Sequence, residues 1–210
     1  MKVNEIFFSI QGEGILMGEP TVFVRTTGCN LRCSWCDSKY AYEDGKEMTV
    51  DEILKEVRSY PVDNVCLTGG EPLIQGNIGL LIRRLLNRGY NVCVETNGSI
   101  SIRNLARTHR LMLSMDIKCP SSGEQAKMLF SEIKHLSEVD QLKFIIADEK
   151  DYEFAKETIS KHRPRCSVIF QPVWGTEMKW LAELILDDGL DVRVMPQLHK
   201  IIWGEGATGV

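Results

Sequence analysis

One stretch of sequence decides the fold: Asn64-Val-Cys-Leu-Thr-Gly-Gly-Glu-Pro72, followed by the segment Ile78–Arg88 and the run Asn91-Val-Cys-Val-Glu95. The first and last parts are short apolar runs with several valines, which is typical of strands. The segment between them has apolar residues at 78, 81, 82, 85 and 86 and ends before Gly89, as an amphipathic helix does. Strand, helix and strand in this order predict a parallel βαβ unit.

The same alternation continues on both sides of this unit. Strands are predicted over Glu5–Ile10, Thr21–Thr26, Asn64–Thr68, Asn91–Glu95, Leu111–Asp116, Gln141–Ala147, Ser167–Gln171 and Asp191–Met195. Helices are predicted after the Thr49/Glu52 capping box and over Ile78–Arg88, Gln125–Leu136, Tyr152–His162 and Glu177–Leu186. The rhythm indicates parallel α/β structure, either a doubly wound sheet or a βα barrel, in a single domain over residues 1–210.

Composition and charge exclude several classes of protein. With 43% hydrophobic and 26% charged residues, the chain is not expected to be disordered. Its 25 basic and 29 acidic residues give a net charge of −4, so no nucleic-acid partner is expected. No apolar run reaches the roughly 18 residues of a membrane span, and the first five residues do not resemble a signal peptide. We therefore expect a cytoplasmic protein with no membrane partner.

The seven cysteines are predicted to be reduced, because their number is odd and three of them cluster between residues 29 and 36. The remaining four, Cys66, Cys93, Cys119 and Cys166, are scattered along the chain. Cys66 and Cys93 lie inside apolar runs, and we expect all four to be small buried hydrophobic residues.

The clustered cysteines form the string Cys29-Asn-Leu-Arg-Cys33-Ser-Trp-Cys36, which follows a predicted strand and Gly28. Three thiolates within eight residues can converge on one soft metal centre. A structural zinc site needs a fourth ligand, which Asp37 or a distant histidine could supply. An iron–sulfur cluster held by three cysteines would instead keep one iron open for a bound molecule.

Polar or glycine-containing segments follow several of the predicted strands: Thr68-Gly-Gly-Glu71, Glu95-Thr-Asn-Gly98, Asp116-Ile-Lys118 and Gln171-Pro172. In βα barrels the carboxyl ends of the strands form the active-site face. These segments therefore predict one large open site on a single side of the sheet.

The spacing of the three cysteines, together with Gly69-Gly-Glu-Pro72, resembles the radical S-adenosylmethionine (SAM) superfamily. The resemblance to its 7-carboxy-7-deazaguanine synthases is closer and runs from about residue 5 to about residue 200. It rests on Gln11-Gly-Glu-Gly14, Arg25, Cys36-Asp-Ser38, Thr68-Gly-Gly-Glu-Pro72, Gln171-Pro172 and Gln197-Leu-His-Lys200.

This resemblance implies an abbreviated βα barrel that forms a homodimer and binds a [4Fe–4S] cluster, SAM and Mg²⁺. It also implies a radical SAM lyase that converts 6-carboxy-5,6,7,8-tetrahydropterin to 7-carboxy-7-deazaguanine with loss of ammonia, on the route to queuosine and archaeosine. The 5′-deoxyadenosyl radical would take a hydrogen atom from the pterin, the ring would contract, and the hydrogen would return to SAM. A flavodoxin or ferredoxin would supply the electron.

The resemblance also implies the site residues. Cluster ligands are Cys29, Cys33 and Cys36, and the magnesium ligand is Ser38. Substrate contacts are Ile10, Gln11, Gly12, Glu13, Arg25, Thr68 and His199. SAM contacts are Trp35, Cys36, Asp37, Gly70, Glu71, Asp116, Ile117, Lys118, Gln171, Pro172, Val173 and Trp174.

The chemistry of two of these groups suits a pterin, although each group has a structural alternative. The amide of Gln11 and the carboxylate of Glu13 match the amino group, N–H groups and carbonyl of a pterin edge, but they could also be solvated turn residues. Arg25 presents a fork that matches the substrate carboxylate, but it could form a structural ion pair.

Two other functions stay open at this stage. A glycyl-radical activating enzyme would share the cluster and SAM but would act on a protein partner. A non-enzymatic zinc- or cluster-binding module would need the three cysteines without the substrate residues.

Overall fold

Nine strands form one sheet, in the order β3–β1–β2–β4–β5–β6–β7–β8–β9, in the computed structural model, which describes residues 1–210. The strands are β1 (Lys2–Ile10), β2 (Pro20–Thr26), β3 (Lys46–Glu47), β4 (Asn64–Gly69), β5 (Asn91–Thr96), β6 (Leu111–Ile117), β7 (Gln141–Ile146), β8 (Ser167–Pro172) and β9 (Arg193–Val194). From β2 to β9 all neighbours pair in parallel, as predicted, whereas β1 pairs antiparallel with β2 and β3. The parallel prediction is wrong for β1 because the short loop between β1 and β2 has no room for a crossover helix.

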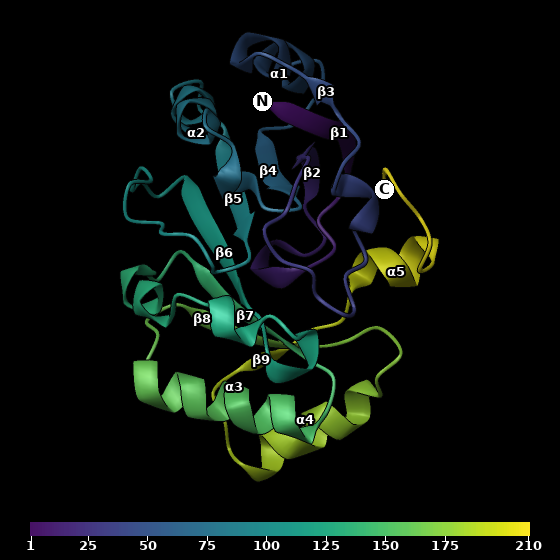
Figure 1. The fold of residues 1–210 in the computed structure, drawn as a ribbon, viewed down its shortest axis with the longest axis vertical. Coiled ribbons are helices and arrows are strands. Elements are labelled where there is room, and N and C mark those ends of the chain that lie inside the picture. Colours follow the sequence, from purple (N-terminus) through teal and green to yellow (C-terminus); the bar gives the residue numbers. More distant parts are fainter.

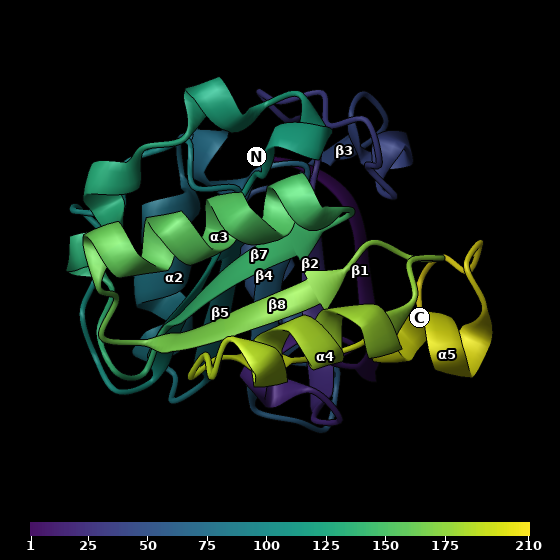
Figure 2. The ribbon, with the colours of Figure 1, turned by 90° about the horizontal axis from the view of Figure 1, so that it is seen from below.

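The sheet curves into an open barrel, with its main helices on the outside (Figure 1). The helices are α1 (Val50–Val57), α2 (Ile78–Leu86), α3 (Glu149–His162), α4 (Met178–Asp187) and α5 (Leu198–Trp203). Figure 2 shows α3 and α4 along the outer face of β7 and β8. A curved sheet with two free edge strands and helices on its convex side is a partial βα barrel, so the predicted fold class is confirmed.

The starts of α1 and α3 follow from side-chain capping. Glu52 N donates to Thr49 Oγ1 over 3.2 Å and Thr49 N donates to Glu52 Oε2 over 2.7 Å, which completes the predicted capping box. Helix α3 begins at Glu149, earlier than predicted, because Asp148 caps it by accepting a hydrogen bond from Asp151 N.

The helix predicted over Gln125–Leu136 is not formed. The segment consists of short 3₁₀ turns at Gln125–Lys127 and Phe130–His135. Side-chain and backbone contacts to the neighbouring loop hold it in this shape: Leu129 N donates to Gly98 O, and the Glu132 carboxylate accepts from Ile102 N. In an α-helix, Leu129 N would instead bond to a carbonyl within the segment. These tertiary contacts therefore outweigh the helical periodicity of the apolar residues.

The strands bury apolar side chains on their outer face and carry a mixed set on the inner face. The outer face packs against the helices in one large core that includes Leu67 and Val94. On the inner face, paired residues of neighbouring strands form a small apolar floor: Phe23, Cys66, Cys93 and Met112. Cys66 and Cys93 are 0% and 4% exposed, and Cys119 and Cys166 are also buried, which confirms the four predictions.

Two segments occupy the open side of the barrel. Ile15 N, in the loop after β1, donates to Gln141 Oε1 on β7 over 2.8 Å. Leu198 N, at the start of α5, donates to Gly12 O over 2.9 Å. The loop after β1 and the α5 segment therefore bridge the gap that the strands leave. None of the helices is both long and apolar enough to cross a bilayer.

Candidate active site

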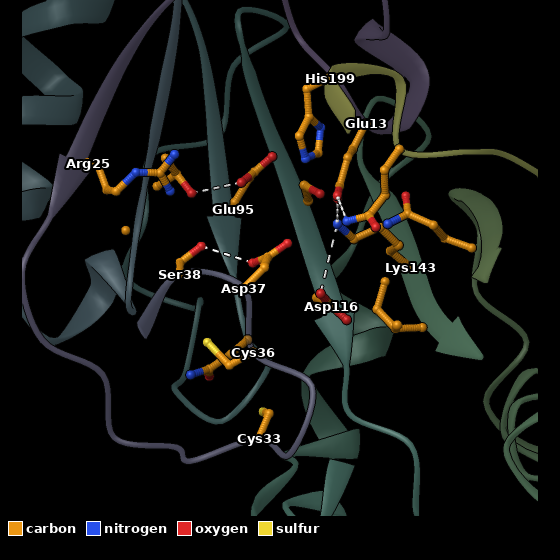
Figure 3. Close-up of a pocket in the computed structure, with 18 of the residues that line it drawn as sticks. Glu13, Arg25, Cys33, Cys36, Asp37, Ser38, Glu95, Asp116, Lys143 and His199 are labelled. Carbon is orange, nitrogen blue, oxygen red and sulfur yellow. Dashed lines mark hydrogen bonds and ion pairs between the residues drawn. The ribbon is translucent and has the colours of Figure 1, made fainter. Parts of the chain in front are cut away.

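A cavity of about 450 Å³ opens at the carboxyl ends of the parallel strands, as the sequence predicted for the polar segments there. Its walls carry inward-pointing polar side chains, and the cysteine loop (residues 29–36) lies at one end (Figure 3). The predicted site residues that line it are Ile10, Gln11, Gly12, Glu13, Arg25, Cys29, Cys33, Trp35, Cys36, Asp37, Ser38, Thr68, Gly70, Asp116, Lys118, Gln171, Val173, Trp174 and His199. Three predicted residues, Glu71, Ile117 and Pro172, are not among its lining residues.

The cysteine loop follows β2 and rests on the turn after β6. Arg32 N donates to Glu124 Oε1 over 2.7 Å, and Trp35 Nε1 donates to Ser121 Oγ over 3.1 Å. Because these contacts span 92 and 86 residues of sequence, the loop depends on the tertiary fold for its shape.

The three thiols fit an iron–sulfur cluster better than a single metal ion. No three His, Cys, Asp or Glu side chains lie within reach of one metal ion. An iron–sulfur cluster does not need three side chains that converge on one ion, because each cysteine holds a different iron. Leu31 N and Asn97 Nδ2 point at Cys29 Sγ over 3.4 and 3.8 Å, and hydrogen bonds of this kind tune cluster potentials. Burial raises the pKa of Cys33 to about 11, so metal binding must displace its proton.

The turn after β4 packs directly against the start of the cysteine loop. Glu71 N donates to Gly28 O over 2.8 Å, and Gly70 N donates to Thr26 O over 3.2 Å. A Cβ on Gly70 would lie 2.5 Å from the Gly28 carbonyl carbon and 2.8 Å from Cys29 Cβ. Only glycine permits this approach, which leaves the backbone of the turn exposed to the cavity.

The Glu71 side chain turns away from the cavity, so only the backbone of this residue is left for the predicted SAM contact. Its carboxylate is fully buried and accepts hydrogen bonds from Asn97 N at 2.6 Å, Thr96 Oγ1 at 3.0 Å and Leu73 N at 3.0 Å. Burial outweighs these donors and raises the pKa of Glu71 to about 7. The carboxyl group thus fastens the turn to β5.

Ile117 and Pro172 also face away from the cavity, because side chains alternate along a strand. Ile117 is fully buried in the outer core, whereas its neighbours Asp116 and Lys118 point into the cavity. Pro172 is buried beside Gln171, which takes the inward position on β8. The family resemblance implies runs of consecutive residues, so it does not distinguish side chains on the inner face of the sheet from those on the outer face.

Arg25 lies on one side of the cavity, where it forms a structural ion pair and also keeps nitrogens free for a substrate carboxylate. Its Nε donates to Glu5 Oε1 over 2.8 Å, so the structural ion pair exists. The terminal nitrogens of its guanidinium have no protein acceptor, and the group lies 5.6 Å from the ring centroids of both Phe7 and Tyr40. The aromatic rings hold the guanidinium plane while its end stays free for a carboxylate.

Glu13 lies on the opposite side of the cavity from Arg25 (Figure 3). One carboxylate oxygen forms an ion pair with Lys143, and the other accepts from Gln197 Nε2 over 2.8 Å. Burial alone would raise the pKa of Glu13, but the Lys143 ammonium holds it well below its usual value. His199 packs on Gly12, where a Cβ would lie 2.8 Å from the His199 Cβ.

Gln11 and Thr68 line the cavity with their hydrogen-bonding groups already engaged. Gln11 Nε2 points at Cys66 Sγ over 3.7 Å, and its Oε1 accepts from Glu13 N over 3.2 Å. Thr68 Oγ1 donates to Glu95 Oε2 over 2.7 Å. Gln11 therefore shapes the loop that presents Glu13.

The side of the cavity nearest the cysteine loop carries further predicted residues. Lys118 Nζ lies 2.9 Å from Asp116 Oδ2 and 5.1 Å from the centre of the Trp35 ring. Gln171 is fully buried, and neither its Oε1 nor its Nε2 has a hydrogen-bond partner in the protein. A buried amide without partners is costly, so both of its polar atoms are free to bond to a ligand.

Ser38 faces the cavity two residues beyond Cys36. Its hydroxyl donates to Asp37 Oδ1 over 3.0 Å, and Asp37 Oδ2 lies 3.0 Å from Lys200 Nζ. Burial alone would raise the pKa of Asp37, but Lys200 lowers it below its usual value.

Two cavity residues, Lys143 and Ser114, are missing from the sequence-based prediction, and Glu95 and Gln197 belong to predicted segments without an assigned role. Lys143, Glu95 and Ser114 lie within or at the end of strands, at inward positions where the sheet interior would otherwise be apolar. A polar residue inside an otherwise apolar parallel strand was the available signal.

Comparison with known proteins agrees with this geometry. The family model described as Radical SAM superfamily matches residues 23–163. A 7-carboxy-7-deazaguanine synthase from Thermoplasma acidophilum is 42% identical over 205 residues, which cover 98% of each chain. One from Koribacter versatilis is 39% identical over 228 residues and covers 100% of each chain.

The crystal structure of QueE from Escherichia coli has a similar fold. It matches with a TM-score of 0.77 and 23% sequence identity, covering 94% of both chains. At this identity the match supports the fold, and the relatives by sequence carry the family assignment.

Proposed function

The chain belongs to the radical SAM superfamily and, within it, to the 7-carboxy-7-deazaguanine synthases, and from this premise we propose that it converts 6-carboxy-5,6,7,8-tetrahydropterin to 7-carboxy-7-deazaguanine with loss of ammonia. Membership of this family disfavours the two alternatives, a glycyl-radical activating enzyme and a non-enzymatic metal-binding module.

One observation carries the substrate assignment: Arg25 and Glu13 face one cavity from opposite sides (Figure 3). A carboxylated pterin has a carboxylate at one end and an edge of N–H donors at the other. The free end of the Arg25 guanidinium suits the first, and the Glu13 carboxylate suits the second. A ligand bound between them would lie across the cavity, beside the cysteine loop.

In this family the cluster and SAM, when bound, supply the radical that takes a hydrogen atom from the substrate. Cys29, Cys33 and Cys36 would hold the cluster, since all three line the same end of the cavity. The backbone at Gly70 and the unpartnered amide of Gln171 would contact SAM. Both groups lie on the wall of the cavity.

The remaining SAM contacts follow from the lining of the cavity near the cysteine loop. Trp35, Cys36, Asp37, Asp116, Lys118, Val173 and Trp174 all face this space. Lys118 and Asp116 hold each other in place, so both can present fixed hydrogen-bonding groups to the polar parts of SAM.

Magnesium, the electron donor and the dimer complete the proposal. The Ser38 hydroxyl is a hard oxygen on the cavity wall, and Mg²⁺ needs few protein ligands because water and substrate oxygens fill its octahedron. A flavodoxin or ferredoxin would deliver the electron near the cysteine loop. Exposed apolar residues on α5, with Ile201 60% and Ile202 50% exposed, offer a surface for a homodimer.

Anaerobic turnover with two substrates tests the proposal. The reconstituted protein should convert the carboxylated tetrahydropterin and leave tetrahydropterin without the carboxylate unreacted, because Arg25 then has no partner. Equal turnover of both compounds, or of neither, would contradict the substrate assignment.

A further inference from the structure

Lys143 is a charged residue in the middle of a strand whose other residues are largely apolar. It lies on β7 between Leu142 and Phe144, which point into the outer core. Its own side chain points into the cavity and is only 6% exposed. The ammonium contacts Glu13 and lies 3.8 Å from Asp116 Oδ2 (Figure 3).

A buried ammonium of this kind persists only with charged partners. Burial alone would lower the pKa of Lys143, but Glu13, Asp116 and Glu95 keep it above its usual value. The same contact keeps Glu13 ionised. Since both groups remain charged inside the barrel, removing either one would leave the other buried without its main partner.

Glu13 is held from a second direction by the segment that leads into α5. Gln197 Nε2 donates to its other oxygen over 2.8 Å, and Leu198 N fixes the loop through Gly12 O. A carboxylate offers about four lone-pair positions, so two remain for a ligand. Lys143 and Gln197 therefore fix the plane of the carboxylate without using its full acceptor capacity.

We propose that Lys143 is a positioning residue that holds the Glu13 carboxylate in place and aims it into the cavity, so that the site selects ligands with paired N–H donors. This inference rests on the proposed function and deepens it. According to the proposal, the Lys143–Glu13 pair discriminates between a pterin, which has an amino group at carbon 2, and a lumazine, which has an oxygen there. The lumazine oxygen would face the Glu13 carboxylate and be repelled.

The test measures binding and therefore does not depend on turnover. The probes are 6-carboxypterin and 6-carboxylumazine, which have no hydrogen at carbon 6 to react, titrated by fluorescence into anaerobically reconstituted protein with SAM. Wild type should bind the pterin more tightly by about tenfold or more, the value of one hydrogen bond to a charged group. Lys143→Met should remove most of this preference.

Lys156→Met is the matched control, because Lys156 also forms ion pairs but lies on α3 and does not line the cavity. It should keep the wild-type preference. A general loss of structure in the Lys143 variant would weaken both probes equally and leave their ratio unchanged, which would overturn the proposal.

Two further variants cover the case in which Lys143→Met does not fold. Glu13→Gln and the double variant Glu13→Gln/Lys143→Met should show the same low ratio of affinities for the pterin and the lumazine, because Lys143 acts through Glu13. A further loss of preference in the double variant would contradict this. Wild type that binds both probes equally would refute the Lys143 proposal alone, whereas wild type that binds neither would refute the proposed function as well.

Discussion

Substituting Gly70 by alanine should damage the fold and the cluster site together. The new Cβ would lie 2.5 Å from the Gly28 carbonyl carbon and 2.8 Å from Cys29 Cβ, closer than real Cβ contacts, which stay beyond 3.0 Å. The turn must therefore move away from the cysteine loop, because the obstacle is backbone and cannot rotate aside.

The size of the effect follows from what that movement disturbs. Overpacking costs about 1–3 kcal/mol. The hydrogen bonds Glu71 N to Gly28 O and Gly70 N to Thr26 O weaken as well, at about 0.5–1.5 kcal/mol each. The free energy of unfolding should fall by about 2–6 kcal/mol, which lowers the melting temperature by at least about 4 °C in a chain of this length.

Thermal unfolding followed by circular dichroism measures the first effect, and iron content after anaerobic reconstitution measures the second. Gly76→Ala is the matched control, since a Cβ there meets nothing within 4 Å. Its stability should change by no more than about 0.5 kcal/mol. Equal melting temperatures and equal iron content in the two variants would refute the reasoning.

Three further predictions concern two residues of the cavity wall and the buried carboxyl group of Glu71. Arg25→Lys keeps the charge but loses the free guanidinium fork, so affinity for 6-carboxypterin should fall by about 1.5–3 kcal/mol while SAM binding persists; unchanged affinity in a titration would leave Arg25 with only its ion pair to Glu5. Ser38→Ala should keep the cluster and SAM cleavage but require more magnesium for half-maximal turnover; an unaltered magnesium titration would mean that the metal binds elsewhere. Glu71→Gln removes a carboxyl group whose pKa burial raises from 4.5 to about 7. As pH rises from 4.5 to about 7, this group ionises in the unfolded chain before it ionises in the folded protein. The free energy of unfolding of wild type should therefore fall by up to about 3 kcal/mol relative to that of the Gln variant over this range. The same pH dependence of the melting temperature in both proteins would contradict this prediction.

Much of the fold and one end of the site were predictable from local sequence. The alternation around Asn64–Glu95 predicts the parallel strands, because each strand and helix has its own periodicity. The cysteine loop and the turn at Gly70 are contiguous motifs, so their chemistry can be read along the chain. Both segments line the same cavity in the structure.

The other end of the site depends on register, which the sequence does not state. Lys143 faces Glu13 only because β7 lies opposite the loop after β1 across the open side of the barrel. Alternation along β6 turns Ile117 into the outer core, and the Glu71 carboxylate turns away from the cavity because groups on β5 and in the turn donate hydrogen bonds to it. The segment Gln125–Leu136 has helical periodicity, yet its contacts to the neighbouring loop prevent a helix.

The most direct test of the central claim is product formation by two matched cysteine variants. Wild type and Cys66→Ala, whose thiol lies in the apolar floor, should both yield 7-carboxy-7-deazaguanine by mass spectrometry. The mixture is 6-carboxy-5,6,7,8-tetrahydropterin, SAM, reductant and magnesium, incubated without oxygen. Cys33→Ala should yield none, because the cluster loses one of its three ligands. Absence of product from wild type, or full product from Cys33→Ala, would contradict the account.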